Sequence, residues 1–201
     1  MKNKNFEKEL PEGYALAQTV DATDKKLGLL MNLAALIIGA VVFGISLIPI
    51  IVSKREIAFD NILPAYLILL IGMIAYIILH ELVHGIAYKS QTGEKLTFGL
   101  KWSCAFCGVP HIFVYRKTAL IAVTAPLIFF TAVFIPLTVA LYFVDTLIYF
   151  AVVIISALHF GGCSGDIYVT YLLLKKYKDP ATLMNDTGPK MTLYVPNKNE
   201  K

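Results

Sequence analysis

The sequence predicts an all-α membrane protein, a four-helix transmembrane bundle, and two observations support that prediction. Of the 201 residues, 57% are hydrophobic and only 16% are charged, whereas soluble domains average roughly 25% charged residues. The charges are also segregated, because the stretches 27–53, 118–144 and 146–165 contain no Asp, Glu, Lys or Arg. Since a transmembrane helix needs about 20 predominantly apolar residues, the sequence excludes a soluble globular domain, a disordered chain and a disulfide scaffold.

The membrane domain is expected at residues 27–174, between a cytoplasmic N-terminal segment (1–26) and an irregular cytoplasmic tail (175–201). Its spans are predicted at about 27–53, 61–88, 118–144 and 146–174. The first is uncharged and far longer than the 7–15-residue core of a signal peptide. The second stays apolar up to Leu79 and then continues through a polar string. The third and fourth are joined at Asp145 by a connection short enough for a tight turn.

The basic residues set the expected orientation. With four spans, 16 of the 18 Lys and Arg residues fall on one side of the membrane and two on the other. The positive-inside rule therefore places both termini and the loop 89–117 in the cytoplasm. The formal charge of +4 is small and scattered, so nucleic acid is not expected as a partner. The lipid bilayer is expected, and the sequence leaves the oligomeric state open.

The polar string of the second span is His80-Glu81-Leu82-Val83-His84, an H-E-x-x-H pattern. On a helix, positions i and i+4 share one face, so both imidazoles can reach one Zn²⁺ ion. The intervening Glu81 is then placed to take a proton from the attacking water rather than to bind the metal. Ionisable groups inside a membrane span cost several kcal/mol unless paired, hydrated or coordinated. A zinc site is therefore favoured over two interfacial histidines at a helix end.

Depth in the membrane selects the third zinc ligand. His80 and Asp166 each lie nine residues before the lysine that marks the cytoplasmic end of the span. At 1.5 Å per residue the two side chains are level, so we expect Asp166 to be the ligand. Two alternatives stay open, namely His159, seven residues deeper in the same span, and Cys163 between them. A hydrogen-bonded residue of the bundle is the other interpretation of His159.

The fourth span is interrupted by a glycine-rich break, residues 161–166, which ends at Asp166. Gly and Ser weaken a helix and let a second backbone approach closely. A peptidase needs this feature, because the scissile bond must lie extended against the site. Gly162 and Gly165 are therefore expected to contact substrate.

An HELVHG motif ending one span, with an Asp in a Gly-rich break of a later one, resembles the site-2 protease type of intramembrane zinc metalloprotease. The stretch 124–127 (Thr-Ala-Pro-Leu) is similar to a motif on the middle core helix of those enzymes. Together with the opening Leu-Pro-Glu-Gly-Tyr (10–14) and four spans, the pattern resembles a bacterial family of small membrane proteins described as putative zincin peptidases. The resemblance implies zinc ligands at His80, His84 and Asp166, Glu81 as general base, and a location in the bacterial plasma membrane.

The loop 89–117 holds two further features. Residues 97–102 and 112–115 alternate well enough to be two strands of a β-hairpin turning near Cys107-Gly108, to whose edge an extended substrate would add. An amphipathic interfacial loop is the alternative. The C-x-x-C pair Cys104 and Cys107, with His111 nearby, is read as structural thiols, with a second metal site and a redox pair as alternatives.

The sequence therefore predicts an intramembrane zinc endopeptidase that hydrolyses membrane-anchored protein or peptide substrates near the cytoplasmic leaflet. The alternative is a catalytically inactive zinc-binding membrane regulator or scaffold. Glu81 discriminates between them, since a scaffold has no use for a base between the two histidines. A small transporter is disfavoured, because the polar groups cluster at one depth and do not form a path across the membrane.

Overall fold

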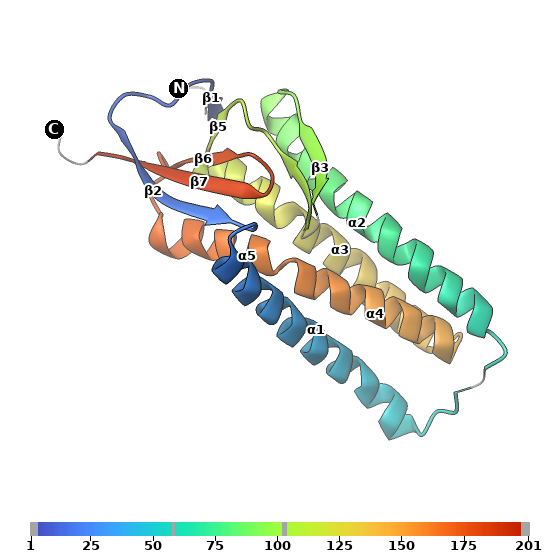
Figure 1. The fold of residues 1–201 in the computed structure, drawn as a ribbon. Coiled ribbons are helices and arrows are strands. Elements are labelled where there is room, and N and C mark those ends of the chain that lie inside the picture. Colours follow the sequence, from blue (N-terminus) through green and yellow to red (C-terminus); the bar gives the residue numbers. More distant parts are fainter. Residues whose placement is uncertain (1–3, 58, 102–103, 198–201) are drawn as a thin grey trace. The chain divides into compact units, whose positions relative to one another are not determined.

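The computed structural model describes residues 4–57, 59–101 and 104–197 (Figure 1). Four helical stretches in these residues are long and apolar enough to cross a membrane. They are α1 (Lys25–Ser53), α2 (Ile62–Thr92), α3 (Arg116–Tyr142) and the stretch Thr146–Lys176. The last comprises α4 (Thr146–Gly162), α5 (Ser164–Tyr171) and a π-helical turn (Leu172–Lys176). The prediction of four membrane-length helices is confirmed.

The prediction of an all-α protein is wrong, because the segments outside the helices form antiparallel sheets. One sheet has five strands in the order β1-β5-β6-β7-β2. The strands are β1 (Phe6–Glu7), β2 (Tyr14–Asp21), β5 (Phe113–Tyr115), β6 (Leu183–Asp186) and β7 (Lys190–Pro196). In Figure 1 the N-terminal strand β2 lies along the C-terminal strand β7. The tail expected to be irregular therefore supplies two strands, and the N-terminal segment supplies two more.

The loop 89–117 forms a β-hairpin, but its first strand pairs with a different segment from the one expected. Strand β3 (Thr97–Lys101) pairs with β4 (Cys104–Gly108), with Phe98 opposite Cys107. The segment 112–115, expected to pair with 97–102, contributes β5 to the five-stranded sheet. A turn closed by the bond from the Ile112 N–H to the Val109 carbonyl separates β4 from β5. Trp102, which the expected strand included, lies outside the described residues.

The described chain divides into two compact units. The first contains both sheets and consists of Met1–Leu30, His80–Pro126 and Gly165–Lys201. The second contains the remaining helical segments, Met31–Leu79 and Leu127–Ser164. In the second unit α1 and α4 approach closely, since a Cβ at Gly161 would lie 2.5 Å from the Ala35 carbonyl oxygen. Glycine is needed there for helix packing.

The centre of the first unit is a set of apolar side chains from β5, β6 and β7. Four of them are fully shielded from solvent, namely Val114, Leu183, Met184 and Leu193. Because β5 lies far from β6 and β7 in the sequence, one core holds the middle of the chain against its C-terminal segment.

Replacing Leu193 with Ala is expected to lower the free energy of unfolding by about 2–5 kcal/mol, since it leaves a cavity in that core. Leu16→Ala on β2 is the matched control, because Leu16 is 62% exposed and should change stability by about 0.5 kcal/mol or less. Denaturant unfolding in detergent, followed by circular dichroism, measures both. Equal stability of the two variants would contradict the placement of Leu193 in the core.

Candidate metal centre

Helix α2 places the two histidines of the H-E-x-x-H string on one face, one turn apart. The ring centroids of His80 and His84 lie 4.9 Å apart, as expected for positions i and i+4. Both residues are nearly buried, at 9% and 8% exposure. The histidines are therefore not solvated residues at a frayed helix end.

Asp166 brings a carboxylate to both imidazoles. It lies in the first turn of α5, directly after the break at Cys163 that separates α4 from α5. Its Oδ2 atom lies 3.4 Å from His80 Nε2 and 3.5 Å from His84 Nε2. The ligand atoms of the three residues all lie within 4.8 Å of one another, and the three belong to the first unit.

These distances fit a tetrahedral zinc ion. Zinc binds His nitrogen at about 2.0–2.1 Å and carboxylate oxygen at about 2.0–2.2 Å, so neighbouring tetrahedral ligand atoms lie about 3.3–3.5 Å apart. Both nitrogen–oxygen distances agree with that spacing. Two histidines and one carboxylate also form the protein ligand set of known catalytic zinc sites. The donor chemistry and the geometry thus both suit zinc.

A backbone carbonyl orients His84. The Nδ1 atom of His84 lies 2.8 Å from the carbonyl oxygen of Ala122 on α3. When Nδ1 carries the proton and donates a hydrogen bond to this oxygen, the lone pair of Nε2 faces the other ligand atoms. Metal-ligating histidines almost always have such an outer partner, which fixes the tautomer and the orientation of the ring.

Glu81 lies beside the three ligands and has a partner of its own. Its carboxylate accepts a hydrogen bond from the backbone N–H of Cys107 on β4, and the residue is half-buried. Among the described residues, the cluster formed by the two histidines and Asp166 does not include Glu81. This is the position expected for a base that serves the site without binding the metal.

Gly85, which follows His84, explains how the β3–β4 hairpin reaches the site. A Cβ at Gly85 would lie 2.8 Å from the Phe98 ring, 3.0 Å from a Leu96 methyl and 3.3 Å from the Cys107 sulfur. Any larger residue would push the hairpin away from α2. Sequence reasoning gave Gly85 no role, although its place directly after the motif was a usable signal.

The two alternative third ligands, His159 and Cys163, lie in the second unit. His159 is fully buried. Its Nδ1 lies 3.2 Å from the Tyr76 hydroxyl and its Nε2 lies 3.4 Å from the Thr131 hydroxyl. The Cys163 sulfur lies 3.6 Å from His159 Nδ1. His159 thus has the contacts of a hydrogen-bonded residue of the bundle, the other interpretation given to it.

The two glycines expected to contact substrate have different surroundings. A Cβ at Gly165 would meet no atom within 4 Å, so the space beside it is open. A Cβ at Gly162 would lie 3.7 Å from the Tyr76 hydroxyl, within the second unit. Contact with substrate stays a prediction for both residues.

Tyr88 and Asp186 form a buried pair that sequence reasoning missed. Tyr88 is 1% exposed and Asp186 is 2% exposed, and the Tyr88 hydroxyl donates to Asp186 Oδ2 over 2.6 Å. Burial raises the pKa of Asp186 to about 6. The hydrogen bonds that its carboxylate accepts from the Tyr88 hydroxyl and the Gly188 N–H oppose that rise. The available signal was the spacing of Tyr88, one helical turn after His84.

Of the two cysteines in the C-x-x-C motif, Cys107 has a side chain that the structure describes. Cys107 is a buried, free thiol, and burial, with the nearby carboxylates of Asp186 and Glu81, raises its pKa to about 12. The side chain of Cys104 lies outside the described structure. His111 is exposed. A thiol with so high a pKa is inert as a nucleophile, which agrees with a structural role for Cys107.

Two histidines one turn apart on a helix, a glutamate between them and a carboxylate from a later helix are the arrangement of a zinc metallopeptidase. A comparison with protein families agrees with this class. Residues 73–180 match the profile of a family described as "Putative zincin peptidase". The match covers more than half of the chain and includes both histidines, Glu81 and Asp166, so the protein belongs to this family, as the sequence predicts. Among curated proteins and among solved structures, no match was found.

Proposed function

We propose that the protein is an intramembrane zinc endopeptidase, of the site-2 protease type, which hydrolyses membrane-associated protein substrates near the cytoplasmic leaflet. The observation that carries this proposal is the spacing of the Asp166 carboxylate from the two histidines, with Glu81 adjacent to them. His80, His84 and Asp166 would hold the zinc ion. When bound, zinc supplies Lewis acidity toward water and toward the peptide carbonyl.

Glu81 supplies the acid–base chemistry. Its carboxylate takes a proton as water attacks the scissile carbonyl and then passes that proton to the leaving amine. The hydrogen bond from the Cys107 N–H engages one part of the carboxylate. The other lone pairs of the carboxylate then serve the water.

The location of the site supports a substrate in the membrane. The histidines lie on α2 and Asp166 lies in the stretch Thr146–Lys176, both long and apolar enough to cross a membrane. The distribution of Lys and Arg favours an orientation with both termini in the cytoplasm, which would place the ligands toward that leaflet. The open space at Gly165 suits the approach of an extended backbone.

Removal of the metal tests the proposal. Purified protein is reconstituted into liposomes with single-span peptides that carry a fluorophore and a quencher on either side of candidate bonds. Cleavage should fall to background after chelation and dialysis, and one equivalent of Zn²⁺ should restore it, whereas Mg²⁺ should not, because it prefers oxygen ligands. Cleavage that survives complete removal of zinc would contradict the proposal. A zinc-loaded protein that cleaves nothing would favour the inactive regulator or scaffold.

A further inference from the structure

A continuous set of contacts connects the C-terminal part of α2, one turn beyond His84, with Glu81 on the same helix, and it passes through β6 and β4. It begins at Tyr88, whose ring is buried one turn beyond His84. The Tyr88 hydroxyl donates to the Oδ2 atom of Asp186 over 2.6 Å. A hydrogen bond to a buried carboxylate is roughly twice as strong as one between neutral groups. The end of α2 is therefore tied to strand β6.

Asp186 continues the chain through its other oxygen atoms. Its Oδ1 accepts the Gly188 N–H over 2.8 Å, which fixes the turn between β6 and β7. Its backbone oxygen accepts the Val109 N–H over 2.8 Å, which holds the residue directly after β4. All the acceptor atoms of Asp186 thus have partners, and these partners lie on three different segments.

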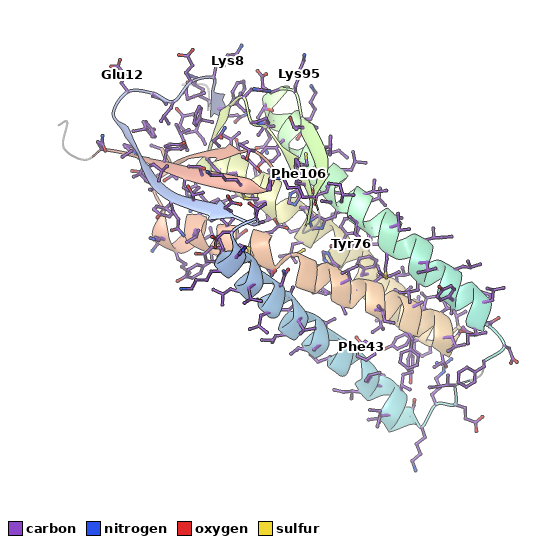
Figure 2. The ribbon with its side chains drawn as sticks, viewed as in Figure 1. Lys8, Glu12, Phe43, Tyr76, Lys95 and Phe106 are labelled. Atoms are coloured by element: carbon purple, nitrogen blue, oxygen red, sulfur yellow. The ribbon has the colours of Figure 1, made fainter. Side chains whose placement is uncertain are left out.

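The β6–β7 turn also packs directly on β4. A Cβ at Gly108 would lie 2.5 Å from the Gly188 nitrogen, so the two backbones are in close contact. The Phe106 ring lies over Gly188, where a Cβ would be 2.1 Å from it; Figure 2 shows this ring in the region of the β sheets. Strand β4 is therefore held on one side by the turn at Gly188.

On its other side β4 meets α2. The sulfur of Cys107 packs at Gly85, and the N–H of Cys107 donates to the Glu81 carboxylate. The position of that N–H depends on the position of β4. The chain of contacts is then closed, from Glu81 through β4 and Asp186 to Tyr88 on the same helix.

We propose that Tyr88 and Asp186 are positioning residues for Glu81: together they hold β4 so that the Cys107 N–H orients the Glu81 carboxylate. This inference rests on the proposed function. Neither residue belongs to the cluster of ligand atoms around His80, and Asp186 lies beyond the matched residues 73–180. Because a base must be held in the correct geometry, a small displacement of β4 lowers the rate without removing the metal.

The test compares Tyr88→Phe and Asp186→Asn with a matched control, Tyr115→Phe. The Tyr115 hydroxyl also donates to a carboxylate, Glu7 Oε1 at 2.7 Å, in the same sheet. The variants are measured in liposomes with the labelled single-span peptide that the wild-type protein cleaves fastest. Tyr88→Phe should lower kcat about 10-fold and leave KM within about twofold, because orientation is lost and binding is kept. Tyr115→Phe should leave both unchanged.

Two further measurements do not depend on activity. Zinc content and the d–d spectrum of the Co²⁺-substituted protein should be the same in all variants. Amide hydrogen exchange of the segment 104–110 should be faster in Tyr88→Phe and Asp186→Asn, and unchanged in Tyr115→Phe. A thermal unfolding curve shows whether each variant is folded.

The outcomes separate this inference from the proposed function. If the wild-type protein cleaves its substrate and Tyr88→Phe has the same kcat, the inference is wrong and the proposed function stands. Loss of zinc from a folded Tyr88→Phe also overturns it, because the pair would then act on the metal ligands. If the zinc-loaded wild-type protein cleaves nothing, the proposed function fails. Unchanged exchange at 104–110 overturns the coupling in either case.

Discussion

Replacing Glu81 with Gln is expected to lower kcat by a factor of about 10²–10⁴, the usual contribution of a general base, while the protein keeps its zinc. Gln has nearly the same size and shape, but its amide cannot take up the proton of the attacking water. Its carbonyl oxygen can still accept the hydrogen bond from the Cys107 N–H that Glu81 accepts. Zinc content by elemental analysis and cleavage of the labelled peptide measure the two effects on the same sample.

Glu94→Gln is the matched control for this variant. Glu94 lies two residues beyond the end of α2 and, like Glu81, is half-buried, and its replacement should leave both zinc and cleavage unchanged. Undiminished cleavage by the Glu81 variant would show that another group is the base. Loss of zinc would instead make Glu81 a ligand. If the wild-type protein is equally inactive, the regulator or scaffold is favoured.

The grouping of the candidate metal ligands was the most predictable part of the molecule. The i and i+4 spacing places His80 and His84 on one face wherever the helix forms, so the pair follows from local geometry. Counting residues to the basic end of each span selects Asp166, and the structure brings its carboxylate within 3.5 Å of both imidazoles. Counting works there because the rise per residue of a helix converts a number of residues into a depth along the span.

The sheet could not be predicted in the same way. Strand β2 pairs with β7 from Tyr14↔Pro196 to Asp21↔Lys190. The local sequence of the N-terminal segment does not indicate that its pairing strand lies near the other end of the chain. The hairpin was misassigned for a related reason. The sequence predicts a turn at Cys107-Gly108, whereas these residues end β4, which pairs with β3. Periodicity indicates that a segment is extended, and the partner is decided by tertiary packing.

The same limit explains Gly85 and Asp186. Gly85 matters because the Phe98 and Cys107 side chains fill the space above it, and neither contact exists until β3 and β4 pair. Asp186 is a charged residue in a C-terminal segment whose polar composition predicts exposure to solvent, but the fold buries it against Tyr88. Interactions between segments that are distant in the sequence cannot be predicted from the residue pattern of either segment alone.

Replacing Asp166 with Asn is the second change of large expected effect, and it should remove zinc from the protein. The variant keeps an oxygen near the two histidines but loses the negative charge that balances the dication. The affinity should therefore fall by more than the about 10–100-fold that loss of an outer-shell partner costs. Asp179→Asn is the matched control, because among the described residues that carboxylate accepts a hydrogen bond from the Ala181 N–H alone, in the turn before β6. Competition with a chromogenic chelator measures the affinity of each variant.

This prediction also decides between the candidate third ligands. If Asp166 binds the ion, Asp166→Asn loses zinc, while His159→Gln and Cys163→Ser keep it in folded protein. If His159 or Cys163 is the ligand, the pattern reverses, and Asp166→Asn keeps zinc. The reasons for the first outcome are the matching distances from Asp166 Oδ2 to both imidazoles and the preference of a carboxylate buried in a membrane-length helical stretch for a positive partner. Without such a partner, the charge of a buried carboxylate would be costly.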